Sequence, residues 1–331
     1  MEDAEVLFYA QGSLGHIVLN RPRAINALTH GMVVAIAAKL EEWAIDDAVH
    51  TVVLTGAGEG GLCAGGDIVA MYRDATAGDG SASETFWRDE YAVDARIARY
   101  PKPFVAIMDG VTLGGGVGLS AHASHRVVTE RSKVGMPETT IGYIPDVGGT
   151  WLLSHAPGEL GTYLALSATT VGPGDAIALG LADYFVPSAS LPALLDDIDS
   201  LEHLAQEPPA AVLLPERDWI DEAFAGDDLA TILARLEGRE IADVIAQKSP
   251  TALAVTLAAL RRAGELPNLE AALAQDLRVS MRSLASADFA EGIRAQVIDK
   301  DRNPRWNPAR VEDVTNVEAY FAPLERELWT R

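Results

Sequence analysis

The segment Leu113-Gly114-Gly115-Gly116-Val117-Gly118-Leu119-Ser120 constrains the fold more than any other part of the chain. It comes shortly after an apolar run, Pro103-Phe104-Val105-Ala106-Ile107-Met108, that predicts a buried strand. Because glycine has no Cβ, a run of glycines lets a ligand or another backbone segment approach closely. When such a run leads from a strand into a helix, it also presents backbone N–H groups that have no partner inside the helix.

An earlier segment, Cys63-Ala64-Gly65-Gly66-Asp67-Ile68, has the same character, with a strand, a glycine loop and then a predicted helix. Two loops of this kind are able to direct their amides at a single oxygen atom that becomes negatively charged. That arrangement is an oxyanion hole.

The order of apolar segments predicts an α/β fold in the first part of the chain. A strand hairpin is predicted over 6–20, an amphipathic helix after Thr29 to about Asp46, and a continuous apolar strand over 51–55. From about Trp219 onward every segment is typical of a helix. We therefore predict an α/β core over residues 1–206 and a helical region over 207–331, with the proline-rich stretch from Glu207 to Pro215 at the start of the second.

Composition excludes several classes of partner. The formal net charge of −22 disfavours nucleic acid, because its phosphates would be repelled. No apolar run approaches the roughly 20 residues of a membrane span, so we expect no membrane partner. The acidic start, Met1-Glu2-Asp3-Ala4-Glu5, is unlike a signal or transit peptide, and the single cysteine suits a reducing compartment, so a cytoplasmic location is expected. Cys63 itself is interpreted as a small buried thiol rather than a nucleophile.

Carboxylates are the remaining candidates for chemistry. The sequence contains no G-x-S-x-G elbow, no H-E-x-x-H motif and no dinucleotide or phosphate loop. Glu138 and Asp146 each stand in an apolar, glycine-bounded segment, where an unpaired carboxylate is costly and often functional. Two structural alternatives remain open: Glu138 as a turn residue, and Asp146 as the N-cap of a helix beginning near Gly148. For Glu90, in a helix predicted over 83–99, the pattern alone favours a solvated face.

Together these motifs resemble the crotonase (enoyl-CoA hydratase/isomerase) superfamily, over about residues 5 to 322. The likeness to the superfamily is carried by Asn20-Arg21-Pro22 with Asn26-Ala27-Leu28 and by both glycine loops. The chain is most similar to the 3-hydroxyisobutyryl-CoA hydrolase branch in the run from Gly114 to Ser120, in Met136-Pro137-Glu138-Thr139, in Pro145-Asp146-Val147-Gly148-Gly149 and in Asp299-Lys300-Asp301. The resemblance implies a spiral of ββα units followed by a helical region that covers an acyl-CoA site.

The resemblance also implies roles for individual residues. The N–H groups of Gly66 and Gly115 would be the oxyanion donors, and Glu138 and Asp146 the nucleophile or acid/base pair. The implied substrate contacts are Glu90, Gly115, Glu138 and Asp146. The implied contacts to coenzyme A are Arg21, Arg23, Ala24, Ala64, Gly65, Gly66, Asp67 and Ile68.

One departure from the superfamily pattern selects the reaction. Hydratases carry a glutamate in the pattern G-G-G-x-E, and this chain has Gly118 at that position. We therefore expect a hydrolase acting on 3-hydroxyisobutyryl-CoA, a step of valine breakdown, with no metal or redox cofactor because coenzyme A is part of the substrate. The alternatives are a hydratase or isomerase that uses Glu138 alone and a CoA-binding protein without turnover. A homo-oligomer is compatible with the resemblance, and the sequence does not select its size.

Overall fold

The computed structural model of the protein describes residues 4–329. Their contacts group them into two compact units, each discontinuous in sequence. The first contains the chain up to Gly66, Asp89–Gly135 and Thr170–Leu214; the second contains Asp67–Arg88, Met136–Thr169 and the chain from Pro215 on. The boundary between residues 206 and 207 stays a prediction. Met1, Glu2 and Asp3, on which the expected cytoplasmic location partly rests, lie outside the described residues.

The first unit is built on two sheets, which comprise six and four strands within the described residues. The larger sheet has the order β1-β2-β3-β5-β7-β10, antiparallel only between β1 and β2. Its strands are β1 (Val6–Gln11), β2 (Leu14–Leu19), β3 (Thr51–Gly56), β5 (Phe104–Met108), β7 (His125–Val128) and β10 (Tyr184–Phe185). The predicted hairpin and the two predicted central strands are therefore confirmed.

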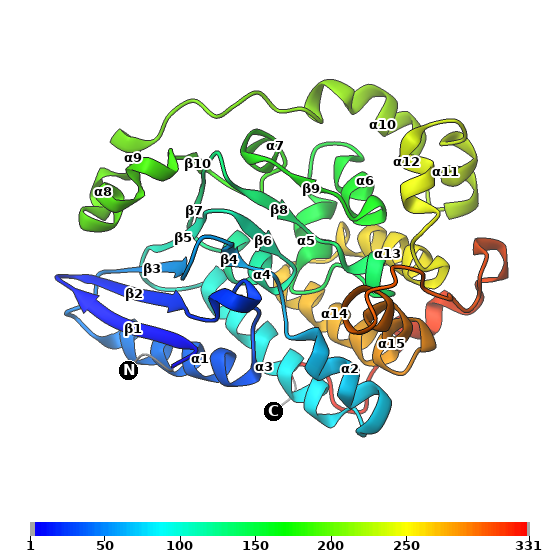
Figure 1. The fold of residues 1–331 in the computed structure, drawn as a ribbon, viewed down its shortest axis with the longest axis horizontal. Helices are drawn as coiled ribbons and strands as arrows, with labels where there is room; N and C mark the ends of the chain where they lie inside the picture. The colour runs from blue at the N-terminus through cyan, green and yellow to red at the C-terminus, as the bar shows by residue number, and fades with distance from the viewer. Residues whose placement is uncertain (1–3, 330–331) are drawn as a thin grey trace. The chain divides into compact units, whose positions relative to one another are not determined.

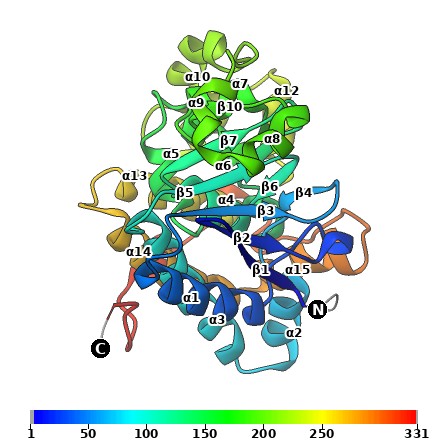
Figure 2. The same ribbon diagram turned by 90° about the vertical axis from the view of Figure 1, so that its left-hand side faces the viewer.

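Helices cover both faces of this sheet. Successive side chains of a strand point to opposite faces, so each face presents its own set of apolar side chains to the helices that cover it. On one face Gly15 approaches Trp43 of α1 (His30–Ile45), and α1 begins at the predicted N-cap Thr29, which accepts a hydrogen bond from the Met32 N–H. The other face packs its apolar side chains against α8 (Leu191–Asp196) and α9 (Leu201–Leu204). Figures 1 and 2 show α1 on one side of the strands and α8 and α9 on the other.

The smaller sheet of the first unit, which the sequence pattern did not reveal, positions both glycine loops. Its order is β4 (Gly61–Cys63), β6 (Val111–Leu113), β8 (Lys133–Gly135) and β9 (Thr170–Val171). The strand that leads into the glycine run is therefore β6 and not the apolar β5. Strands of two or three residues carry too little periodicity to be recognised in a sequence. The unit also contains α4 (Gly115–Ala121) and α7 (Pro173–Ala178).

The second unit is mainly helical up to Ile298, whereas residues 299–329 contain only two 3-10 turns, η7 (Val311–Asp313) and η8 (Val317–Phe321), so the helical structure expected throughout the region after Trp219 is wrong there. Its elements are α2 (Ile68–Ala77), α5 (Gly149–Ser154), α6 (Leu160–Ser167), α10 (Arg217–Phe224), α11 (Leu229–Arg235), α12 (Glu240–Ile245), α13 (Pro250–Ala263), α14 (Leu269–Leu284) and α15 (Ala287–Ile293), with the 3-10 turn η2 (Glu138–Ile141). A core cluster joins Ile144 to Val255 of α13, Val279 of α14 and Phe321. The long helix α3 (Ser81–Ala98) contributes its first half to this unit and its second half to the other. None of the helices within residues 4–329 is long and apolar enough to cross a membrane.

Candidate active site

Two backbone amides of the first unit lie close to one point in space. Gly65 and Gly114 have φ values of +103° and +50°, which are favourable only for glycine, and they turn the chain just before Gly66 and Gly115. A Cβ placed on Gly115 would lie 3.4 Å from the Gly66 nitrogen. Because Gly115 is the first residue of α4, its N–H has no acceptor inside that helix. The structure therefore brings together the two predicted oxyanion donors.

Glu90 of α3 lies beside the same point. Its Oε1 is 2.5 Å from the position that a Cβ of residue 115 would occupy, and only 2% of the residue is exposed. The solvated face that the sequence pattern favoured for Glu90 is therefore wrong. The reason is tertiary: the second half of α3 turns this carboxyl toward the glycine run.

The predicted coenzyme A contacts of the first unit form one connected surface. The Ala64 N–H donates to the Ile25 carbonyl at 2.9 Å, and the Leu28 N–H donates to the Gly65 carbonyl at 2.8 Å. These bonds hold the loop of Ala64, Gly65 and Gly66 beside the short helix η1 (Pro22–Ala24), which contains the exposed Arg23 and Ala24. Arg21 pairs with Glu5, with 3.1 Å between Nε and Oε1.

The last two predicted contacts, Asp67 and Ile68, begin the second unit. Asp67 is the N-cap of α2, and its Oδ1 accepts a hydrogen bond from the Ala70 N–H at 3.3 Å. Ile68 is the first residue of that helix.

Cys63 is unsuited to nucleophilic chemistry. The thiol is completely buried at the end of β4, and burial raises its pKa to about 12, with a further rise from the charge of Glu90. A thiol with so high a pKa is protonated at neutral pH and a poor nucleophile. The interpretation as a buried structural thiol is confirmed.

The two predicted acids of the second unit are both buried: Glu138 is 7% exposed and Asp146 is 5% exposed. Glu138 begins the turn η2 after Pro137, and its Oε2 has no hydrogen-bond partner among the described residues. Burial raises the pKa of Glu138 well above its ordinary value, and the negative charge of Asp146 raises it further. A carboxyl whose pKa is raised in this way is a stronger base than one in water.

Asp146 is not the N-cap of the following helix. Helix α5 begins at Gly149 and its N-cap is Gly148, which carries no capping side chain. The carboxyl of Asp146 instead accepts a hydrogen bond from the Tyr143 hydroxyl, with 3.0 Å between Oη and Oδ2. The structural alternative for Asp146 is therefore wrong, because the chain turns at Val147 and Gly148, both at positive φ, before the helix starts.

A third buried carboxyl, Asp276 of α14, was missed by the sequence analysis. Its two oxygens accept hydrogen bonds from the Gly148 N–H and the Thr150 hydroxyl, each at 2.9 Å, so it fixes the loop that follows Asp146. Burial raises the pKa of Asp276 well above its usual value, and the charge of Asp146 adds to this, while the two hydrogen bonds oppose it. The available signal was an aspartate on the apolar stripe of a predicted helix, next to Leu273 and Leu277.

We expect the Asp276→Asn variant to have a flatter dependence of stability on pH. A carboxyl whose pKa is higher in the folded chain stabilises the fold below its unfolded pKa of about 3.9, and this contribution is lost as pH rises through the folded value. Asparagine does not titrate, so it removes the pH-dependent contribution. The hydrogen bond to Thr150 is kept, because the Thr150 hydroxyl is able to rotate and accept from the asparagine N–H. Thermal unfolding at several pH values above about 4 measures the effect. If the melting temperatures of the variant and the wild type change with pH in the same way, the Asp276 carboxyl does not have a raised pKa in the folded chain.

Comparison with known proteins identifies the family. Residues 14–321 match the model of the enoyl-CoA hydratase/isomerase family. The chain belongs to that family. A protein of Xenopus tropicalis named 3-hydroxyisobutyryl-CoA hydrolase, mitochondrial, is 37% identical over 98% of this chain and 90% of its own length. The human protein of the same name is 36% identical over 94% of this chain and 86% of its own length.

Solved structures of this family share the fold and have other names. A structure titled carnitinyl-CoA dehydratase, from Mycobacterium thermoresistibile, is 51% identical with a TM-score of 0.95 and covers 98% of both chains. One titled enoyl-CoA hydratase, from Rhodobacter sphaeroides, is 44% identical with a TM-score of 0.92 and covers 97% of this chain and 98% of its own. The predicted crotonase-like α/β fold with a helical C-terminal region is thus confirmed, as is membership of an enzyme family. The names of the relatives disagree on the reaction.

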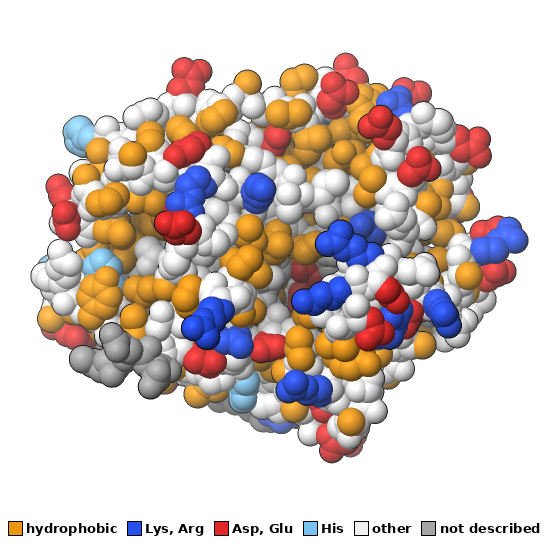
Figure 3. All heavy atoms as spheres, viewed as in Figure 1, with side chains coloured by type: hydrophobic (Ala, Val, Ile, Leu, Met, Phe, Trp, Pro, Cys, Tyr) orange, Lys and Arg blue, Asp and Glu red, His pale blue; other side chains and the backbone are white. Residues whose placement is uncertain are grey.

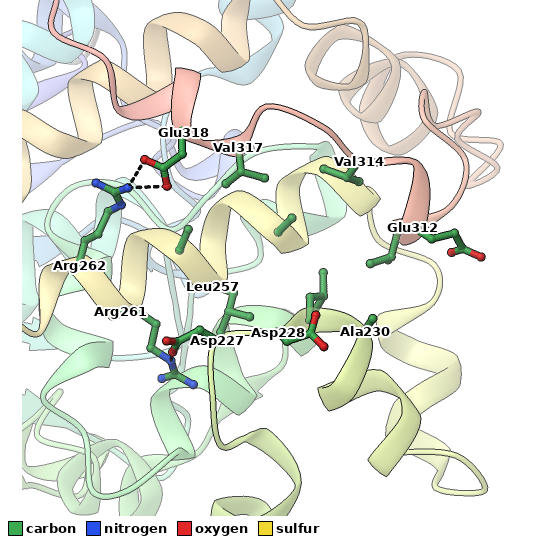
Figure 4. A pocket seen from close by; sticks show the side chains of 14 residues that line it. Asp227, Asp228, Ala230, Leu257, Arg261, Arg262, Glu312, Val314, Val317 and Glu318 are labelled. Atoms are coloured by element: carbon green, nitrogen blue, oxygen red, sulfur yellow. Dashed lines mark hydrogen bonds and ion pairs between the residues drawn. The ribbon is translucent and has the colours of Figure 1, made fainter.

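The second unit also has a groove of about 510 Å³ that none of the predicted site residues lines. Figure 4 shows it between α13, α11 and the segment that contains Val314 and Val317. Its arginines are neutralised within the unit, because Arg261 pairs with Asp227 at 3.3 Å and Arg262 with Glu318 at 2.6 Å. Because both of its arginines are paired with acids, this groove offers no unpaired positive charge to the phosphates of coenzyme A.

On the face drawn in Figure 3, acidic side chains are interspersed with basic and apolar ones instead of forming a continuous acidic surface. Within residues 4–329 no group of three or more His, Cys, Asp or Glu side chains is arranged to hold a metal ion.

Proposed function

We propose that this protein hydrolyses an acyl-CoA thioester, with 3-hydroxyisobutyryl-CoA as the substrate and 3-hydroxyisobutyrate and free CoA as the products. The observation that carries this proposal is the pair of buried carboxyls, Glu138 and Asp146, together with Gly118 at the position where a hydratase has the first of its two glutamates. Relatives named 3-hydroxyisobutyryl-CoA hydrolase, similar over nearly the whole chain, support it.

In the proposed reaction the amides of Gly66 and Gly115 donate hydrogen bonds to the thioester oxygen as it becomes an oxyanion. Donors already in place cost no reorganisation in the transition state, and each contributes on the order of 3 kcal/mol in comparable sites. Glu90, buried beside these amides, binds the hydroxyl of the acyl group. Arg21, Arg23 and the loop of Ala64, Gly65 and Gly66 bind coenzyme A, with Asp67 and Ile68 at the end of that loop.

Glu138 acts in one of two ways, as the nucleophile or as the general base. Its carboxylate adds to the carbonyl and expels the CoA thiolate, leaving an anhydride that water then hydrolyses; alternatively it takes a proton from a water molecule that attacks directly. Asp146 donates the proton that the departing sulfur needs and recovers it from water. Both routes take the nucleophile or base, the acid and the oxyanion donors from the protein itself, and neither oxidises or reduces the substrate. We therefore propose that turnover needs no metal or redox cofactor and continues in the presence of a chelator.

A second candidate function is hydration or dehydration of an acyl-CoA. It is favoured by the structures titled carnitinyl-CoA dehydratase and enoyl-CoA hydratase, which are more similar in sequence than the hydrolases. Against it stands Gly118, since addition of water to an enoyl thioester by the two-carboxylate mechanism requires a second acid at that position.

Release of free thiol from 3-hydroxyisobutyryl-CoA distinguishes these functions. We expect thiol to appear with this substrate, and no change in enoyl absorbance with crotonyl-CoA at a rate typical of a dedicated hydratase. Loss of enoyl absorbance without thiol would overturn the hydrolase in favour of the second function. Tight binding of acyl-CoA with neither signal would identify a binding protein without turnover.

A further inference from the structure

The side chain of Arg294 holds the acids of a surface loop in the second unit. Its Nε lies 2.8 Å from an oxygen of Glu291 in α15. Its Nη1 lies 2.7 Å from a carboxyl oxygen of Asp299 and 2.7 Å from one of Asp301, and its Nη2 donates to the Asn303 carbonyl at 3.4 Å. Both aspartates of the loop are therefore bound by one guanidinium group.

The backbone of this loop is anchored as well. The Arg302 N–H donates to the Ala295 carbonyl at 3.0 Å, and the Arg305 N–H donates to Oε1 of Glu291 at 2.7 Å. Lys300 and Arg302 have φ values of +58° and +53°, in the left-handed region that is unfavourable for residues with a Cβ. Backbone in such a conformation persists where the surrounding bonds fix it, and it is concentrated at ligand-binding and active sites.

Three basic side chains of the loop have no acidic partner. Lys300, Arg302 and Arg305 are exposed, and none of them forms an ion pair with an acid among the residues that the structure describes. The charge of Arg305 acts on Asp301 only at longer range, and Asp301 is already bonded to Arg294. Residues 291–305 contain four basic and three acidic side chains, so this segment is basic in a chain whose net charge is −22.

The loop adjoins the part of the second unit that contains two of the predicted coenzyme A contacts. It follows the π-helical turn η6 (Arg294–Ile298), and both α15 and η6 pack against α2. Helix α2 begins at Ile68, with Asp67 as its N-cap. Coenzyme A contains a diphosphate bridge and a 3′-phosphate monoester, so a ligand that reaches α2 brings phosphate groups to this part of the unit.

We propose that Lys300, Arg302 and Arg305 form a binding site for a phosphate monoester, the 3′-phosphate of the coenzyme A part of the substrate. The inference rests on the proposed function, because it requires that the protein binds an acyl-CoA. A phosphate monoester has a charge of about −1.5 to −2 at neutral pH, whereas each phosphate of the bridge has a single charge. The monoester therefore gains most from three neighbouring cations. Arginine binds phosphate oxygens through paired N–H donors, and lysine adds a point charge.

The test compares the binding of CoA and of 3′-dephospho-CoA by titration calorimetry. We expect the wild type to bind CoA more tightly by about tenfold or more, since hydrogen bonds to charged groups are the stronger ones. Lys300→Gln, Arg302→Gln and Arg305→Gln are each expected to weaken CoA binding by about three- to tenfold. Their affinity for 3′-dephospho-CoA is expected to stay unchanged, because that ligand lacks the group in question. A substitution that only disturbed the fold would weaken the binding of both ligands alike.

Lys133→Gln is the matched control. Lys133 is an exposed lysine of β8, so its substitution changes the net charge by the same amount outside the loop. It is expected to leave the ratio of the two affinities unchanged. The proposal is overturned if the wild type binds the two ligands equally, or if the loop variants lose the same affinity for both.

Inorganic phosphate probes the other source of the same chemistry. In the wild type it is expected to compete with CoA and not with 3′-dephospho-CoA. If inorganic phosphate binds to the wild type and not to the loop variants, while CoA and 3′-dephospho-CoA bind equally, the ligand of the loop is a free phosphate and the assignment to coenzyme A is wrong.

Failure of the proposed function is distinguishable from failure of this inference, because CoA itself is not cleaved and its binding is measured without turnover. If the wild type releases no thiol but the loop variants lose the preference for the 3′-phosphate, the phosphate site is supported and the hydrolase is not. If the wild type releases thiol and every loop variant keeps that preference, the hydrolase is supported and the phosphate site is rejected.

Discussion

The Glu138→Gln variant is expected to lose turnover by about 10²–10⁴-fold, the contribution typical of a positioned acid or base. Glutamine keeps the size of the side chain and its capacity for hydrogen bonds, but it neither attacks a thioester nor removes a proton from water. Because the lost interaction acts mainly in the transition state, binding of the acyl-CoA is expected to change little. Steady-state kinetics of thiol release and titration calorimetry with a non-cleavable CoA thioether measure the two quantities.

Asp175→Asn provides a control for this substitution. Asp175 is also a buried carboxylate, and it accepts a hydrogen bond from the Leu213 N–H at 2.8 Å outside the candidate site. We expect the Asp175→Asn variant to leave turnover unchanged.

We expect the Asp146→Asn variant to lower turnover as Glu138→Gln does. The double variant is expected to be little worse than either single variant, because the effects of groups that act as a unit are not additive. Turnover near that of the wild type in Glu138→Gln would remove Glu138 from the reaction.

The Gly115→Ala variant is expected to lose turnover by about 10²–10³-fold, comparable with the loss of one oxyanion donor. The added methyl group would lie 2.5 Å from Glu90 Oε1 and 3.4 Å from the Gly66 nitrogen, in the space in front of the paired amides. Alanine is a better helix former than glycine, so the start of α4 does not lose helix propensity. A loss of turnover in a protein whose circular dichroism is unchanged therefore reports on the site.

Gly31→Ala is the matched substitution, since Gly31 lies in the first turn of α1 and its added methyl group would come no closer than 3.8 Å to the atoms around it. It is expected to retain full turnover. Gly115→Pro places a Cβ in the same space and also removes the N–H, so a loss of turnover beyond that of Gly115→Ala measures the contribution of the donor. Full activity in a folded Gly115→Pro protein would show that this amide is not a donor.

Local patterns allowed much of the fold to be predicted. The first hairpin and the continuous strand Thr51–Gly56 appear in the structure close to their expected bounds, and the region after Trp219 contains the long helices α13 and α14, as its helical pattern predicts. In each case neighbours in sequence supply the periodicity that determines which face is buried. The glycine loops were also predictable, since the close approach at Gly115 and the positive φ of Gly65 and Gly114 need residues without a Cβ.

Contacts between distant segments determined the rest. The sequence by itself determined the family, the two glycine loops and the identity of Glu138 and Asp146 as the acids to consider. Only the tertiary structure decided that Glu90 is buried, that Asp146 does not cap α5, and that Asp276 and Ser280 reach the segment of Tyr143 and Asp146 from more than a hundred residues away. The physical reason is that a carboxyl's burial and hydrogen-bond partners depend on which helices pack around it, and local periodicity contains no information about those partners.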